Sequence, residues 1–185
     1  MLARKGESSV MSITTKRGDE GTTDLLFGGK SSKTAPQVEA LGEVDELNAV
    51  LGLARVAMDG EAAEVIDQIQ KWLVTLMGEL AMPEGKDEAY EKAGFGRITE
   101  KEIEWVENLS GGIEGDRKFE GWLRPGETGG ELAARLHLAR TVARRAERSA
   151  WKVSEKVATR ELRIFLNRLS DAFWLMARKS EEALG

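Results

Sequence analysis

Residues 131–157 read ELAARLHLARTVARRAERSAWKVSEKV, and their pattern decides the fold. Apolar side chains recur at alternating spacings of four and three residues, at Leu132, Leu136, Ala139, Ala143, Ala146, Ala150, Val153 and Val157. This heptad-like spacing predicts one long helix, over about residues 131–156, whose apolar edge packs inside a left-handed bundle.

The same periodicity predicts three further long helices. One begins after Pro36, one fills residues 62–80 and ends before Met82-Pro83, and the last covers about residues 161–183. No alternating β pattern, internal repeat or low-complexity tract competes with this interpretation. We therefore expect an all-α fold, a five-helix up-and-down bundle of the ferritin-like kind.

The fifth expected helix is shorter. It should begin at Thr99, where Glu102 completes a capping box and Ile98 can pack on Ile103. We expect Gly111-Gly112 to end it, because glycine is unfavourable inside a helix.

Length and composition indicate the broad class of protein. The chain has 185 residues, which favours a single domain, here residues 13–185 after a flexible tail of residues 1–12. No apolar run approaches the roughly 20 residues that cross a bilayer, and no leader peptide opens the chain. We therefore expect a cytoplasmic protein with no membrane partner.

Two residue counts narrow the chemistry. The chain has no Cys and one His, which excludes a thiolate nucleophile, a zinc cluster and the usual di-iron bundle site, which needs two histidines. Its net charge of −5 argues against nonspecific binding to nucleic acid. Any anionic ligand must therefore meet cations that are concentrated locally.

Residues 13–29 are rich in Gly, Thr and Asp, and we expect a loop with a short extended piece at Leu25–Phe27. Its Lys-Arg pair beside two glycines and several hydroxyl side chains suits a phosphate-binding loop, although by itself such a stretch is more typical of an ordinary surface turn. Gly29-Lys30-Ser31 does not complete a P-loop, because that motif needs glycine where Asp24 stands.

Cations also gather on the predicted long helix. Arg140, Arg144 and Arg148 repeat every four residues, with Arg145 beside them. Like charges at this spacing repel one another by roughly 0.2–0.5 kcal/mol per pair, so a compensating anion is expected. Either acidic neighbours such as Glu147 on a solvated face, or a polyphosphate or buried carboxylate matched to the guanidinium, would compensate the charge.

Polar residues interrupt two other apolar helices. They are Asp45, Glu46 and Asn48 in the first helix, and Asn167, Arg168 and Asp171 in the last. Polar groups that face a bundle interior need partners, so these residues either bridge helices or contact a ligand.

Three stretches, read together, point to one family. They are TKRGDEGTTDLLFGGKSSKTAPQVEALGEVDELNAVLG, LHLARTVARRAERSAW and FLNRLSDAFWLMAR. In order and spacing they closely resemble the PduO-type ATP:cob(I)alamin adenosyltransferases, also called corrinoid adenosyltransferases. The resemblance implies a cobalamin adenosyltransferase-like helical bundle that forms a homotrimer, with each active site between adjacent subunits. It also implies transfer of the 5′-deoxyadenosyl group of ATP to cob(I)alamin, giving adenosylcobalamin and triphosphate.

The resemblance assigns the site residues. Its ATP-binding set is Thr15, Lys16, Arg17, Gly18, Thr23, Asp24, Lys33, Arg144, Arg145, Glu147, Arg148 and Asn167. Lys16, Lys33 and Arg144 would be the catalytic residues, because with Arg148 and Mg²⁺ they would neutralise charge on the leaving triphosphate. Asp45 and Arg140 would form an ion pair between subunits. Lys30 departs from the family, where an arginine is more usual, and the ligands of Mg²⁺ stay unassigned.

The implied reaction needs no protein nucleophile, because the cobalt of cob(I)alamin attacks ATP. The implied partners are ATP, a corrinoid, a flavoprotein reductase and an adenosylcobalamin-dependent enzyme. Two other functions compete: a non-catalytic trimer that binds ATP or adenosylcobalamin and delivers the cofactor to a dependent enzyme, and a structural bundle with a solvated arginine face.

One aromatic residue and the single histidine complete the candidates. Trp122 stands where the family has Phe in an F-x-L-P-G-G stretch, which implies an apolar wedge beneath the corrin; plain packing is the alternative. Arg124 and Glu127 depart from that stretch and leave its loop geometry open. For His137 we favour packing or hydrogen bonding within the bundle over a role as a cobalt ligand.

Overall fold

The structure is a computed structural model that describes residue 16, residues 18–119, residue 121 and residues 124–184. Within these residues it has six helices: α1 (Pro36–Arg55), α2 (Gly60–Leu80), α3 (Asp87–Lys92), α4 (Glu100–Glu114), α5 (Gly130–Ala150) and α6 (Arg160–Leu184). The strands β1 (Thr22–Asp24) and β2 (Lys30–Ser32) pair antiparallel, and the 3-10 helix η1 (Leu26–Gly28) lies between them. The expected, mostly helical fold is confirmed. The predicted tail, residues 1–12, lies outside the described residues.

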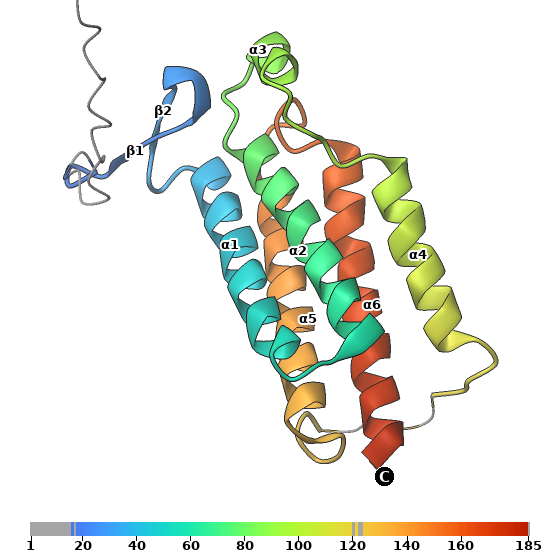
Figure 1. Cartoon of the computed structure of the whole chain (residues 1–185). Coiled ribbons are helices and arrows are strands. Elements are labelled where there is room, and N and C mark those ends of the chain that lie inside the picture. Colours follow the sequence, from blue (N-terminus) through green and yellow to red (C-terminus); the bar gives the residue numbers. More distant parts are fainter. Residues whose placement is uncertain (1–15, 17, 120, 122–123, 185) are drawn as a thin grey trace, which may run out of the picture.

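The five long helices lie side by side and share one apolar core (Figure 1). Helix α5 packs against α1 and α6, α6 packs against α4, and α1 packs against α2. Trp72 of α2 meets Trp105 of α4 edge-on, with ring centroids 4.8 Å apart, and also contacts Phe165 of α6. The core therefore draws on all five long helices.

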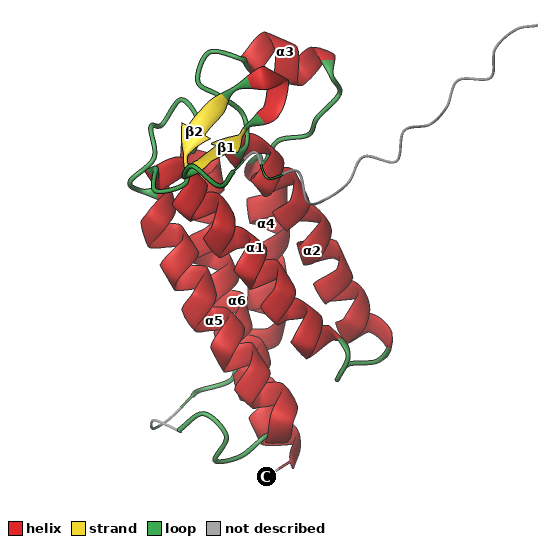
Figure 2. Ribbon diagram, turned by 90° about the vertical axis from the view of Figure 1, so that its left-hand side faces the viewer, coloured by secondary structure: helices red, strands yellow, loops and turns green. Residues whose placement is uncertain are grey.

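The β1–β2 hairpin lies at the end of the bundle where α1 begins, next to α3 (Figures 1 and 2). The Leu26 N–H donates to the carbonyl oxygen of Ala81, just after α2, at 2.9 Å. The Phe27 ring packs edge-on against Tyr90 of α3 and against Phe95. Backbone and aromatic contacts thus fix the loop after β1 to the end of α2 and to α3.

Several predicted boundaries were wrong. The extended piece expected at Leu25–Phe27 is a turn, since Phe27 adopts a φ of 54°, and the strands lie on either side of it. Gly111-Gly112 do not end α4, which continues because Ile113 is buried in the core, and Gly115 at φ 48° ends it. Helix α5 ends at Ala150, although Val153 and Val157 stay buried in the turns that follow. The short α3 was not predicted at all.

The predicted capping box of α4 is confirmed, because the Thr99 N–H donates to Glu102 Oε2 at 2.8 Å. The residue before it, Ile98, donates its N–H to Glu79 Oε1 of α2 at 2.7 Å. Glu79 is fully buried, and this burial raises the pKa of its carboxyl to about 7 against the opposing effects of Ile98 and Arg97. A titratable buried group therefore joins α2 to the start of α4.

Glu79 should make stability depend on pH. Between about pH 4.5 and pH 7 the folded protein keeps a proton that the unfolded chain has released, so stability falls as the pH rises through this window. Glu79→Gln keeps the acceptor for Ile98 and removes the titration. As the pH is raised from 5 to 8, the unfolding free energy of Glu79→Gln should therefore rise by about 2–3 kcal/mol relative to that of wild type. Urea unfolding at both pH values measures this change, and parallel pH profiles would contradict it.

No helix among the described residues combines the length and the hydropathy that a membrane span requires.

Candidate functional site

The loop before α1 brings Lys33 against Gly18. The Lys33 N–H donates to the carbonyl oxygen of Gly21 at 2.8 Å, which folds the end of β2 back over the loop. The Lys33 ammonium lies directly over Gly18: a Cβ there would be 3.0 Å from Lys33 Nζ and 3.2 Å from the Thr22 carbonyl oxygen. Glycine at position 18 therefore permits a close approach that a larger residue would obstruct.

The other predicted residues of this loop are only partly described. Lys16 is exposed and adopts a φ of 58°, Thr23 is half-buried on β1, and Asp24 pairs in register with Lys30 of β2. Thr15 and Arg17 lie outside the described residues. Lys16, Lys30 and Lys33 form no ion pair with any carboxylate among the residues that the structure describes.

The arginines of α5 divide into two groups. Arg145 is neutralised by an ion pair with Glu46 of α1, and this hydrogen bond raises the pKa of the guanidinium. Arg144 and Arg148 are exposed, and neither pairs with a carboxylate among the residues that the structure describes. Their one mutual contact is a hydrogen bond from Arg148 Nη1 to the Arg144 carbonyl oxygen at 3.0 Å.

Glu147, the acidic neighbour expected to neutralise Arg144 and Arg148, forms a hydrogen bond with a different residue. Its Oε1 accepts from the indole N–H of Trp151 at 3.4 Å. The interpretation of Arg144 and Arg148 as a face neutralised by intrachain salt bridges therefore does not apply to the described residues. Two adjacent cations remain available on α5 for an anion from outside the chain.

The predicted pair Asp45 and Arg140 does not form within one chain. Asp45 is exposed on α1, and the described residues include no ion pair between it and Arg140 of α5. Arg140 Nε is nevertheless buried without a hydrogen-bond partner among them. A buried guanidinium N–H is costly when unpaired, so Arg140 still needs an acceptor.

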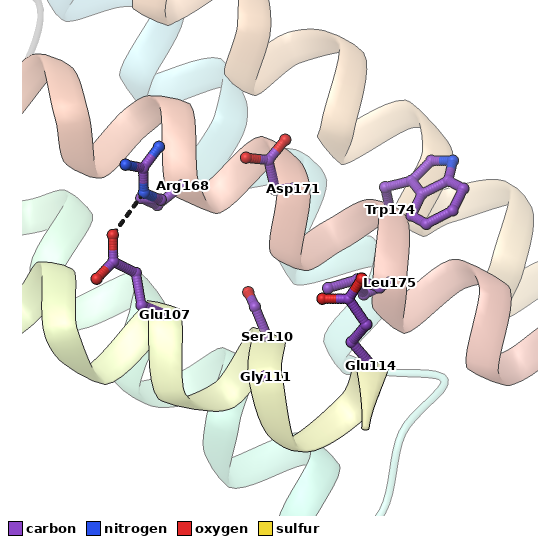
Figure 3. A pocket seen from close by; sticks show the side chains of 8 residues that line it. All are labelled: Glu107, Ser110, Gly111, Glu114, Arg168, Asp171, Trp174 and Leu175. Carbon is purple, nitrogen blue, oxygen red and sulfur yellow. Dashed lines mark hydrogen bonds and ion pairs between the residues drawn. The ribbon is translucent and has the colours of Figure 1, made fainter. Parts of the chain in front are cut away.

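Asn167 is half-buried on α6. Its Oδ1 accepts from Arg168 Nη1 at 3.0 Å, and Arg168 pairs through Nε with Glu107 of α4 at 2.6 Å. Among the described residues, no hydrogen bond joins Asn167 to the arginines of α5. Figure 3 shows Arg168 and Asp171 of α6 facing Glu107 and Glu114 of α4 across a pocket of about 450 Å³. This acidic pocket is unsuited to a polyphosphate.

At the end of the bundle away from the β1–β2 hairpin, a buried polar cluster joins α5 and α6. Glu181 accepts at 3.0 Å from Arg178 Nη1 and lies 3.0 Å from His137 Nε2, and all three residues are buried. The prediction that His137 hydrogen-bonds within the bundle is confirmed. Sequence reasoning missed Arg178 and Glu181; the only signal was a pair of charged residues within the apolar pattern of α6.

The same cluster fixes both ends of the connection between α4 and α5. At one end, Phe119 packs on Trp174 with ring centroids 5.0 Å apart, and its ring lies under the Arg178 guanidinium. At the other end, Gly129 adopts a φ of 73° and lies so close to α6 that a Cβ at this position would be 2.7 Å from Glu181. Between them, the two departures from the family stretch pair with each other: Glu127 accepts from both the Arg124 N–H and its guanidinium at 3.2–3.3 Å. Trp122 lies outside the described residues.

Comparison with known proteins identifies the family of the chain. The sequence profile of the family described as Cobalamin adenosyltransferase matches residues 13–180. The chain belongs to the cobalamin adenosyltransferase family. The two segments described above, the loop before α1 and the arginines of α5, both fall inside the matched region.

Relatives in this family are named for one activity. Corrinoid adenosyltransferase PduO of Salmonella typhimurium is 36% identical over 174 residues, which cover 92% of this chain and 50% of the relative. A corrinoid adenosyltransferase of Bacillus subtilis is 36% identical over 178 residues, which cover 91% of this chain and 86% of the relative. The chain thus spans about half the length of the Salmonella and Citrobacter PduO relatives and most of the Bacillus one.

Solved cobalamin adenosyltransferase structures share the fold. A variant of the PduO-type enzyme from Lactobacillus reuteri complexed with ATP has a TM-score of 0.78 at 31% identity, covering 92% of this chain and 94% of that chain. Another variant, complexed with cobalamin and ATP, has a TM-score of 0.78 at 32% identity and covers 92% of this chain and 91% of that chain.

Proposed function

We propose that this chain is an ATP:corrinoid adenosyltransferase. In the proposed step, the electron pair of cob(I)alamin cobalt forms a bond to C5′ of ATP, and the C5′–O bond breaks. Triphosphate leaves with the electron pair of that bond, and the cobalt passes formally from Co(I) to Co(III). The products are adenosylcobalamin and triphosphate. No side chain of the protein is consumed, which suits a chain with no Cys and one His.

The observation that carries this proposal is the pair of uncompensated arginines on α5. Arg144 and Arg148 are exposed next to Arg145, whose charge Glu46 already neutralises. Cations placed on a helix beside the phosphates can stabilise negative charge that develops on a leaving triphosphate. Lys16 and Lys33, beside Gly18, would supply the same stabilisation from the loop.

We propose that the site is shared between subunits of a homotrimer. Among the described residues, no hydrogen bond or ion pair joins the loop at residues 16–33 to Arg144 or Arg148. A second subunit would bring its loop to these arginines. Its Asp45 would also give the buried Arg140 Nε the acceptor that it lacks in one chain.

A shared site predicts complementation between two inactive variants. Lys33→Ala removes the loop cation and Arg144→Ala removes the helix cation, so homotrimers of either should lose most activity. In randomly mixed trimers, about a quarter of the interfaces would combine an intact loop with an intact helix. Co-expression of both variants should therefore restore up to about a quarter of wild-type activity, whereas a site within one chain gives no recovery.

Among the described residues, no three His, Asp or Glu side chains gather in a way that could hold a metal ion. We propose that Mg²⁺ comes with the substrate, bound to the phosphates of ATP, as is usual for this cation. We propose that Trp122, which lies outside the described residues, contacts the corrin.

The test supplies ATP, Mg²⁺ and chemically reduced cob(I)alamin under anaerobic conditions and follows the corrin spectrum. Loss of cob(I)alamin with formation of adenosylcobalamin is the expected result. ATP binding without turnover would instead favour a non-catalytic trimer that delivers cofactor to a dependent enzyme. The absence of both ATP binding and turnover would contradict the proposed function.

A further inference from the structure

Trp151 follows α5 directly and is exposed for no evident structural reason. The residue is 59% exposed, more than any other aromatic residue among the described ones. The backbone there is still helical, with φ −68° and ψ −19°, and its N–H donates to the Glu147 carbonyl oxygen at 3.2 Å. The indole is therefore an ordered group on the surface and not part of a loose loop.

The inner face of this indole is already occupied. The guanidinium carbon of Arg163 lies 4.6 Å from the ring centroid, a distance typical of a cation–π contact. Arg163 is itself buried, and its Nη2 donates to the Val153 carbonyl oxygen at 2.9 Å. The indole N–H is directed to Glu147. Both the plane and the edge of the ring are thus fixed, and the outer face is the one left for a ligand.

Trp151 lies on the same face of the helix as Arg144 and Arg148, the two arginines without a carboxylate partner among the described residues. Arg144, Arg148 and Trp151 stand at positions i, i+4 and i+7, so they share one face of the helix. With a rise of 1.5 Å per residue, about 10 Å of helix separates Arg144 from Trp151. An aromatic platform therefore lies one turn beyond two phosphate-seeking cations. A nucleoside triphosphate has the same order of parts, a flat base joined through a ribose to the phosphates.

We propose that Trp151 is the stacking platform for the adenine base of ATP, with Arg163 as the positioning residue that holds the indole in place. This inference rests on the proposed function and names a further substrate contact within the same site. Stacking of a base on an aromatic side chain is worth about 1–3 kcal/mol, which corresponds to about 5- to 150-fold in affinity.

The test compares binding of ATP and of inorganic triphosphate to the full chain by calorimetry. Trp151→Leu should weaken ATP binding about 5- to 150-fold and leave triphosphate binding unchanged, because only ATP carries a base. Trp151→Phe should recover most of the loss. Trp174→Leu, which alters another exposed tryptophan at the α4–α6 surface, is the matched control and should leave ATP affinity unchanged.

The outcomes separate this inference from the proposed function. If wild type binds ATP and Trp151→Leu binds it equally well, the platform is wrong and the function stands. If Trp151→Leu weakens ATP and triphosphate to the same degree and changes the sedimentation coefficient, Trp151 packs between subunits and the platform is again wrong. If wild type binds neither ligand, the proposed function fails and the inference fails with it.

Discussion

Arg144→Ala is expected to lower the rate of adenosyl transfer about 100- to 1000-fold, the usual loss when one donor to developing negative charge is removed. The protein should keep its helical circular dichroism and its melting temperature. Arg144 is exposed, and its side chain forms no hydrogen bond or ion pair with the described residues; its backbone carbonyl oxygen accepts from Arg148, and alanine retains that acceptor. The measurement is turnover from cob(I)alamin and ATP beside a thermal melt.

The matched control is Arg160→Ala. Arg160 is also an exposed arginine, at the start of α6, and its side chain is 64% exposed in a loose pair with Glu100 at 3.8 Å. Exposed pairs of this kind contribute about 0–1 kcal/mol, so this variant should retain both activity and stability. An Arg144→Ala protein that melts early would show that the arginine has a structural role instead.

Glu181→Ala is expected to destabilise the protein by about 3–5 kcal/mol, because it leaves buried Arg178 without its carboxylate. His137 loses its partner in the same substitution. For a chain of this size, a loss of 3–5 kcal/mol lowers the melting temperature by roughly 6–20 °C. The loss should also release the connection between α4 and α5, since Phe119 and Gly129 both pack on this cluster.

The neighbouring residue provides the control. Glu182 pairs with Arg117 at 3.4 Å, but its side chain is 47% exposed, so Glu182→Ala should cost no more than about 1 kcal/mol. Differential scanning calorimetry of both variants measures the difference. Similar melting temperatures for the two would contradict the structural role of the buried cluster.

The sequence predicted the helices well where burial follows a helical period. It failed where a buried residue does not lie in a helix: Val153 and Val157 continue the spacing of α5, yet they pack from turns. The spacing of apolar residues predicts which residues are buried, but it does not predict whether the backbone at each of them is helical. It also missed that Ile113 carries α4 past two glycines, because packing outweighs their intrinsic preference.

The candidate site was predictable as a set of residues but not as a geometry. Arg144 and Arg145 are adjacent in one motif, and only the fold shows that Glu46 neutralises Arg145 and leaves Arg144 free. The contact between Lys33 and Gly18 likewise depends on the hairpin that folds the chain back. His137 and Glu181 are 44 residues apart, so their pairing had no local signal.

The central claim is that cobalt attacks C5′ and expels the whole triphosphate. The measurement that tests it most directly is the product ratio after a single turnover of ATP with cob(I)alamin, with adenosylcobalamin and the phosphate products separated by ion-exchange chromatography. The account predicts one intact triphosphate for each adenosylcobalamin formed. Formation of ADP and phosphate, or adenosylcobalamin without triphosphate, would contradict it.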